Sequence, residues 1–132
     1  MSLLLLDTTF LIEAERRGID LDDIIENDDG AAIAAITVAE LLVGAKLASG
    51  KRQTSRQAYV DDAMASLPII AYDTEVAVEH AELLVAVREA GRPRGAHDLV
   101  IAATARATGR TVVTMDRRAF ADLPGVTVTT HD

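Results

Sequence analysis

Leu3-Leu4-Leu5-Leu6-Asp7-Thr8-Thr9 begins as a short apolar run. The run stops abruptly at the carboxylate of Asp7, which is followed by two hydroxyl side chains. Four leucines with helix-starting residues directly after them favour a buried strand of a parallel sheet over the opening of a helix. Asp7 then lies at the carboxyl end of that strand. In open α/β sheets ligands bind at this edge, because the helices that follow turn their N-termini toward the same crevice. The alternative is structural: Asp7 or Thr8 could cap the next helix.

The composition indicates one domain without soft metal ligands. The 132 residues are the size of a single domain, so we expect one domain over residues 1–132, and 49% apolar content is enough for a covered core. The chain has no cysteine, which excludes thiolate metal sites and agrees with a reducing, cytoplasmic setting. Residues 1–6 are too short for a signal peptide and no later segment is long enough to span a bilayer, so we expect no membrane association.

The net charge of −8 is concentrated at the start of the chain. Residues 1–30 hold nine acids and two bases, a net charge of −7, whereas the remaining residues hold twelve acids and eleven bases. A nucleic-acid partner normally requires a basic surface, so only the nearly neutral second part is compatible with one. Aromatic residues make up 3% of the chain, which argues against a stacking platform for bases. If a polynucleotide binds, charge and a metal must supply most of the interaction.

Apolar runs and helical patterns alternate along the chain. We expect strands at residues 3–6, 31–36, 69–72, 111–114 and 126–129, and a turn at residues 28–30. The alanine-rich run 31–36 could also be helical by propensity. We expect helices at residues 8–17, 21–27, 37–47, 51–66, 74–90 and 99–108. The helices 37–47 and 51–66 would form a hairpin, and the helix 74–90 carries Ala77, Ala81, Leu84 and Val85 on one stripe. This alternation predicts an α/β domain with a mostly parallel central sheet flanked by helices, with the last strand at an edge.

Four acids share one position relative to these elements. Asp7 follows the first strand and Glu40 lies in the first turn after the second. Asp98 heads the apolar helix, and Asp116 follows a late strand. Parallel strands end at one edge of a sheet, so the four side chains can converge on one cleft. Each has a structural alternative: Asp7 and Asp98 could be helix caps, Glu40 could end a capping box begun by Thr37, and Asp116 could be a turn residue.

Carboxylates that converge cannot all stay charged unless a cation lies between them. Oxygen ligands without cysteine or a histidine cluster suit Mg²⁺ or Mn²⁺. One or two such ions activate a water molecule and neutralise a leaving oxygen, which is the chemistry of phosphodiester hydrolysis. Thr8 and Thr114 lie beside the acids and could orient ligands or water.

Taken together, these motifs resemble a known family. Leu-Leu-Asp-Thr at 5–8, Thr-x-x-Glu-Leu at 37–41 with Gly44, Asp-Leu-x-Ile-Ala-Ala at 98–103 and Thr-x-Asp at 114–116 with Phe120 are similar, in order and spacing, to the PIN-domain ribonucleases of the VapC toxin type. The resemblance implies a Mg²⁺- or Mn²⁺-dependent endoribonuclease acting on RNA. Its catalytic and metal-binding residues would be Asp7, Glu40, Asp98 and Asp116. The resemblance also implies a homodimer and a VapB-like antitoxin whose tail covers the cleft.

Other functions are less consistent with the sequence. A phosphatase of the haloacid dehalogenase type needs a second Asp two residues after the first, where this chain has Thr9. A response-regulator receiver needs a late Lys, and no Lys follows Lys51. A PIN-like binding module without catalysis would be favoured if one of the four acids were replaced, and all four are present.

The motifs leave several polar residues near the acids without a catalytic role. His97 matches no metal ligand that the resemblance supplies, and we interpret it as a structural or helix-start residue. Four arginines could guide RNA or could simply be a solvated surface; they are Arg92, Arg94, Arg117 and Arg118.

Overall fold

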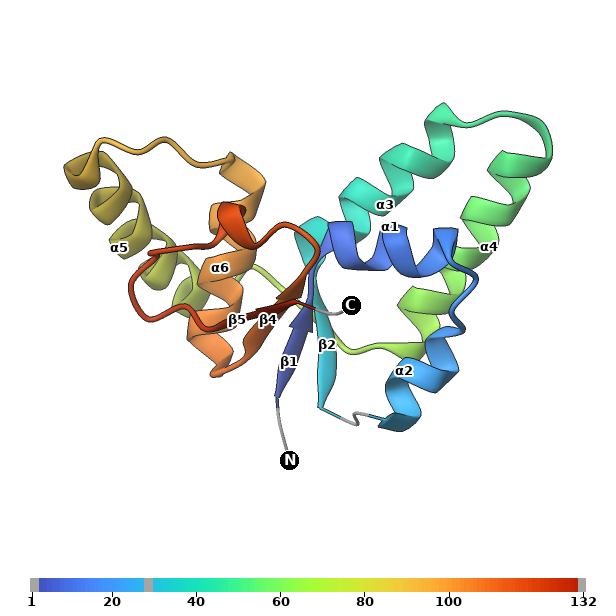
Figure 1. Ribbon diagram of the computed structural model, residues 1–132, viewed down its shortest axis with the longest axis horizontal. Helices are drawn as coiled ribbons and strands as arrows, with labels where there is room; N and C mark the ends of the chain where they lie inside the picture. The colour runs from blue at the N-terminus through green and yellow to red at the C-terminus, as the bar shows by residue number, and fades with distance from the viewer. Residues whose placement is uncertain (1–2, 28–29, 131–132) are drawn as a thin grey trace.

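The fold is organised around a parallel sheet. A computed structural model describes residues 3–27 and 30–130, without the side chains of 25–27, so the turn expected at residues 28–30 lies largely outside the described residues. The strands are β1 (Leu4–Leu6), β2 (Ala31–Ala34), β3 (Ile69–Ile70), β4 (Thr111–Thr114) and β5 (Val128–Thr130). They pair in the order β3-β2-β1-β4-β5, and every pairing is parallel. Asp7 therefore follows the central strand (Figure 1).

Helices cover both faces of the sheet (Figure 1). One face packs against α1 (Thr8–Arg16), α2 (Leu21–Asn27), α3 (Ala35–Leu47) and α4 (Gly50–Ser66), and the other against α5 (Thr74–Ala90) and α6 (Ala96–Thr108). Successive strand residues point to opposite faces, so Leu5 packs with α5 and α6 while Leu6 packs with α1 to α4. These two layers confirm the predicted α/β class with a central parallel sheet.

The long helices lie where the sequence predicts them. α3 and α4 form the expected hairpin, and α6 buries Leu99 and all of residues 101–105, as its apolar composition predicts. Within the described part of the chain, no helix is both long enough and apolar enough to cross a membrane.

The start of α3 differs from the prediction. The sequence predicts a strand over residues 31–36, whereas β2 ends at Ala34 and α3 begins at Ala35. Alanine is the strongest helix former, so the end of this run joins the helix. Because Ala34 precedes α3 and provides no side-chain cap, Thr37 lies inside the helix. The predicted capping box of Thr37 and Glu40 is therefore wrong.

α5 buries a different stripe from the predicted one. Val76 and Leu83 are buried in the core shared with α6, whereas Ala81, Leu84 and Val85 are exposed. The helix is apolar on more than one side, and packing against α6 selects only one of them.

Two strands differ in length or position from the prediction. β3 is only two residues long, and β5 begins at Val128, although it lies at the expected edge of the sheet.

Candidate active site

Asp7 is fixed at the carboxyl end of the central strand and is 2% exposed. Its Oδ1 accepts the backbone N–H of Phe10 at 2.9 Å, so Asp7, and not Thr8, caps α1. Its Oδ2 accepts the Thr114 hydroxyl at 2.6 Å, and the Thr9 hydroxyl donates at 2.9 Å from Oδ1. Burial raises the pKa of Asp7, and the hydrogen bonds that it accepts oppose that rise. Asp7 is thus a cap whose carboxylate is also held rigidly at the sheet edge.

Glu40 reaches the same edge from α3. Its Oε1 accepts the Thr8 hydroxyl at 2.7 Å, and its Oε2 lies 3.3 Å from His97 Nδ1. Thr37, whose side chain is completely buried, contacts the Thr8 hydroxyl at 3.3 Å. Because Glu40 lies inside α3, its side chain caps nothing. Its two hydrogen-bond partners instead orient the carboxylate toward the carboxyl edge of the sheet.

Asp98 lies in the first turn of α6 but does not cap it. The N-cap is Gly95, so the alternative of Asp98 as a helix cap is wrong. Burial raises the pKa of Asp98, and the negative charges of Asp7, Glu40 and Asp116 raise it further. Within the described residues its carboxylate accepts no hydrogen bond. Among the described residues no hydrogen bond stabilises the charged form of Asp98, and only the neighbouring His97 opposes the rise in its pKa.

Asp116 lies two residues after the end of β4 and is exposed. Its backbone N–H donates to the Thr114 hydroxyl oxygen at 2.9 Å, and its carbonyl accepts the N–H of Ala119 at 3.2 Å at the start of the short 3₁₀ helix Arg117–Ala119. The fully buried Thr114 thus joins the carboxylate of Asp7 to the backbone of Asp116. Asp116 is a turn residue whose side chain remains free to reach the cluster.

The structure brings Asp7, Glu40, Asp98 and Asp116 to the carboxyl edge of the sheet, close enough for their charges to interact. We call these four residues the acidic cluster. Within residues 3–27 and 30–130, no three acidic or histidine side chains are grouped tightly enough to hold one metal ion as they lie. Their chemistry nevertheless fits a hard cation, because all are carboxylates and their repulsion is what a cation relieves. Asp98 and Asp116 have no side-chain hydrogen bonds among the described residues, so no hydrogen bond holds these two carboxylates in place.

Two residues without a predicted role lie in the site. The Thr9 hydroxyl lies 3.2 Å from Thr114 Oγ1 and accepts the N–H of Met115 at 3.2 Å. His97 lies in the first turn of α6, which agrees with the helix-start position interpreted from the sequence, and its Nδ1 lies 3.3 Å from Glu40 Oε2. The only indication of these contacts in the sequence is position. Thr9 lies two residues after Asp7, and His97 directly precedes Asp98.

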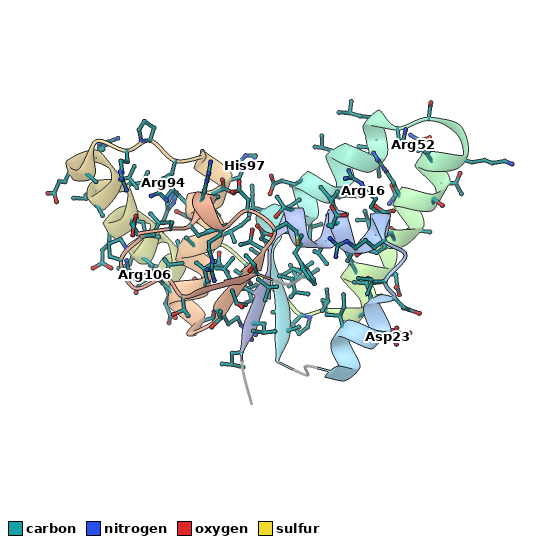
Figure 2. The ribbon with its side chains drawn as sticks, in the orientation of Figure 1. Arg16, Asp23, Arg52, Arg94, His97 and Arg106 are labelled. Carbon is teal, nitrogen blue, oxygen red and sulfur yellow. The ribbon has the colours of Figure 1, made fainter. Side chains whose placement is uncertain are left out.

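Arg94, which is labelled in Figure 2, binds the loop that carries Asp116, and Arg92 contacts the same loop. The Arg94 guanidinium donates to the carbonyl oxygen of Ala121 at 2.6 Å and to that of Ala119 at 3.3 Å. Arg92 forms an exposed ion pair with Asp122 at 3.2 Å. Arg94 therefore has an internal structural role that neither alternative from the sequence anticipated.

Comparison with known proteins agrees with this geometry. A family model described as PIN domain matches residues 4–126. The chain belongs to the PIN domain family. The resemblance drawn from the sequence motifs is thereby confirmed, and the five-stranded parallel sheet is the central sheet of this PIN domain.

The relatives of this PIN domain include a VapC endonuclease and a plasmid stability protein. The tRNA(fMet)-specific endonuclease VapC of Salmonella typhimurium is 29% identical over 102 residues, which are 77% of this chain and 76% of the relative. The plasmid stability protein StbB of Pseudomonas syringae pv. tomato is 33% identical over 127 residues, 89% of this chain and 91% of the relative. Among solved structures, a chain of DNA-bound VapBC from Salmonella typhimurium superposes with a TM-score of 0.87 at 26% identity, covering 98% of both chains.

Proposed function

We propose that this PIN domain, extending over residues 1–132, is a metal-dependent endoribonuclease and the toxin of a toxin–antitoxin pair. One observation carries the proposal: four carboxylates gather where the central parallel strands end, and the neighbouring threonines orient two of them. The name of the VapC relative, an endonuclease specific for a tRNA, supports RNA as the substrate class. Cellular RNA is met in the cytoplasm, where we expect the protein to act.

Each acidic residue would have a distinct part in holding the ion. Asp7, fixed by Thr114 and Thr9, would be a rigid ligand, and Glu40, held by Thr8, would be a second one. Asp98 and Asp116 would turn toward the ion when it binds. Bound Mg²⁺, or Mn²⁺ in its place, supplies an activated water and neutralises the leaving oxygen of a phosphodiester.

A VapB-like antitoxin is the partner that we propose. The DNA-bound VapBC complex of Salmonella typhimurium supports such a pairing. In the absence of metal, the four acids attract a cationic side chain, and an Arg or Lys from a partner would form charge-assisted hydrogen bonds there. Such a contact would block both metal and substrate.

We also propose that the chain forms a homodimer. Val78 and Val85 on the outer side of α5 are 58% and 54% exposed, and they offer apolar area for a second copy. Light scattering at micromolar concentration should give twice the mass of one chain, and a strict monomer would count against the dimer.

RNA cleavage with and without metal tests the proposed activity. Purified protein should cleave RNA when Mg²⁺ or Mn²⁺ is added and should stop when EDTA is present. Asp7→Asn should abolish cleavage without unfolding the chain, because Asn still accepts the N–H of Phe10 but carries no charge. Asp23→Asn, at an exposed acid of α2, is the matched control and should cleave normally. Cleavage that EDTA does not diminish would reject the metal site.

A further inference from the structure

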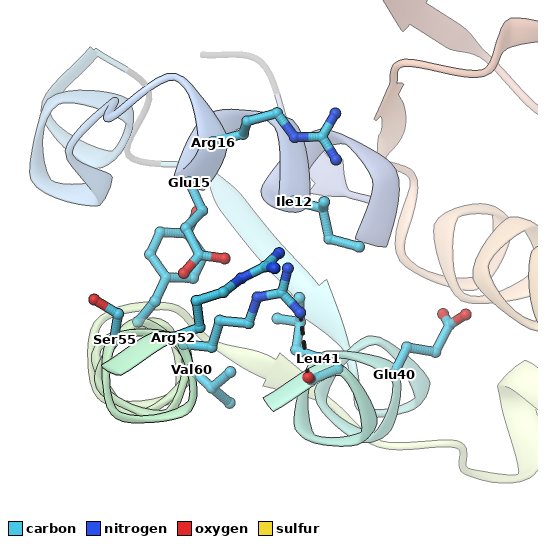
Figure 3. Close-up of a pocket in the computed structure, with 11 residues that line it drawn as sticks. Ile12, Glu15, Arg16, Glu40, Leu41, Arg52, Ser55 and Val60 are labelled. Carbon is cyan, nitrogen blue, oxygen red and sulfur yellow. Dashed lines mark hydrogen bonds between the residues drawn. The ribbon is translucent and has the colours of Figure 1, made fainter. Parts of the chain in front are cut away.

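A groove between α1, α3 and α4 opens beside the candidate active site (Figure 3). Its volume is about 300 Å³, and Ile12, Leu41 and Val60 contribute its apolar lining. Glu40 lies at one end of the groove and Glu15 at the other. Because Glu40 also belongs to the acidic cluster, one end of a ligand bound in the groove would lie next to that cluster.

Three arginines line this groove. Arg16 comes from α1, whereas Arg52 and Arg56 are one turn apart on α4. Figure 3 shows Arg52 reaching into the groove between its two ends. In the described part of the chain neither Arg52 nor Arg56 forms an ion pair, and Arg56 donates only to the carbonyl oxygen of Gly44, at 3.3 Å. Arg52 and Arg56 carry like charges four residues apart on α4, so they repel each other. Without an ion pair, nothing offsets this repulsion, and an anion bound between them would do so.

The cationic surface continues beyond the groove. An adjoining cavity at the tip of the α3–α4 hairpin is also lined by Arg52 and Arg56, together with Leu47 and Ser49. Residues 41–60 contain four bases and no acid, although the rest of the chain has 21 acids and only nine bases. Residues 41–60, which span the connection of the α3–α4 hairpin, are therefore a basic segment in an acidic protein.

We propose that this groove binds the phosphodiester backbone of the RNA strand that enters the active site, with Arg16, Arg52 and Arg56 contacting phosphates. The proposal rests on the ribonuclease function proposed above. The acidic cluster repels a polyanion, so binding needs cations outside the cluster but next to it. Guanidinium groups form paired hydrogen bonds with phosphate, and such contacts position a strand without reading its sequence.

The test measures RNA affinity at several salt concentrations. Arg52→Gln/Arg56→Gln is made in an Asp7→Asn background, so that bound RNA is not cleaved, and a labelled 12-nucleotide single strand is titrated. Each lost phosphate contact lowers the slope of log affinity against log salt by about 0.7 for a single strand, so the double substitution should lower the slope by about 1.4. It should also weaken binding by about tenfold or more at low salt.

Two further variants make the result specific. Arg88→Gln removes one exposed arginine from the distant α5 and should leave affinity and slope as they are in the Asp7→Asn background. Arg52→Lys/Arg56→Lys keeps the charges and should retain most of the salt slope. Thermal unfolding establishes that every variant is folded before RNA is added.

Three outcomes would overturn the proposal. If the double Gln substitution keeps the affinity and slope of its Asp7→Asn parent, the groove does not bind RNA, although the ribonuclease proposal stands. If it weakens binding of the antitoxin but not of RNA, the groove is a protein-binding surface instead. If neither the unsubstituted chain nor the Asp7→Asn chain binds RNA, the proposed function fails as well.

Discussion

At Asp7, helix capping and site chemistry belong to one side chain. The sequence presents them as alternatives, but the structure shows the carboxylate accepting the N–H of Phe10 with one oxygen and the Thr114 hydroxyl with the other. The cap therefore orients the carboxylate that the chemistry would use. A residue type common at helix starts can thus also be a functional one, and only its partners distinguish the two roles.

Glu40→Gln separates charge from structure. The amide oxygen of Gln can still accept the Thr8 hydroxyl, and no capping box is lost because Glu40 lies inside α3. The free energy of unfolding without metal should change by less than about 0.5 kcal/mol or rise, since repulsion among the acids is relieved. Mn²⁺ affinity and RNA cleavage should fall steeply. Near-normal cleavage combined with lower stability would show that Glu40 has only a structural role.

Gly95→Ala should displace Asp98. A Cβ at position 95 would lie 2.7 Å from Asp98 Oδ2, whereas the backbone there, at φ −60° and ψ 135°, accepts any residue. We expect the Asp98 side chain to rotate away, so that cleavage falls severalfold or more while the unfolding temperature changes little. The unsubstituted chain is the reference for both measurements. Unchanged cleavage by Gly95→Ala would contradict this role of Gly95.

At the scale of elements, local signals predicted helices and strands well where they were unambiguous. Asp20 and Asp73 cap α2 and α5, because a side chain and the backbone a few residues later are enough to form a cap. The alanine run at β2 could be strand or helix, and its division at Ala34 depends on tertiary pairing with β1 and β3. The buried stripe of α5 likewise depends on its contact with α6.

The candidate site divides in the same way. The positions of the four acids follow from strand ends, which the sequence shows. The hydroxyl network of Thr9, Thr114 and Asp7 does not, because it requires β1 and β4 to be neighbours, and these strands are more than 100 residues apart. The structural role of Arg94 could not be predicted from the sequence for the same reason, since its partners lie on a distant segment.

Arg94→Gln should loosen the loop that follows β4. The guanidinium donates to three carbonyl oxygens of this loop, which would lose their partner. We therefore expect a loss of about 1–3 kcal/mol in unfolding free energy and weaker Mn²⁺ binding through Asp116. Urea unfolding measures the first effect. Arg92→Gln removes only the exposed pair with Asp122 and should cost at most about 1 kcal/mol. If both variants were equally stable, the hydrogen bonds of Arg94 to the loop would not contribute to stability.

For the whole molecule, the acidic cluster makes stability depend on pH. The pKa of Asp98 is raised above its usual 3.8, so the folded chain binds its proton more tightly than the unfolded chain does. Its contribution to stability is complete below the usual pKa and is lost as pH rises through the raised pKa. In EDTA, Asp98→Asn should therefore have a higher unfolding temperature than the unsubstituted chain at pH 7. That gain should shrink as the pH falls toward 4, and a gain independent of pH would argue against the shift.

The four acids should bind a divalent cation, and Mn²⁺ titration by calorimetry measures that binding. The unsubstituted chain should show saturable binding, and Asp98→Asn should weaken it by about tenfold or more, since even the loss of an outer partner of a metal ligand costs this much. Asp23→Asn, which removes an equal charge from exposed α2, should bind Mn²⁺ as the unsubstituted chain does. If Asp98→Asn and the unsubstituted chain bound Mn²⁺ equally, or if neither bound it, the acidic cluster would not be a metal site.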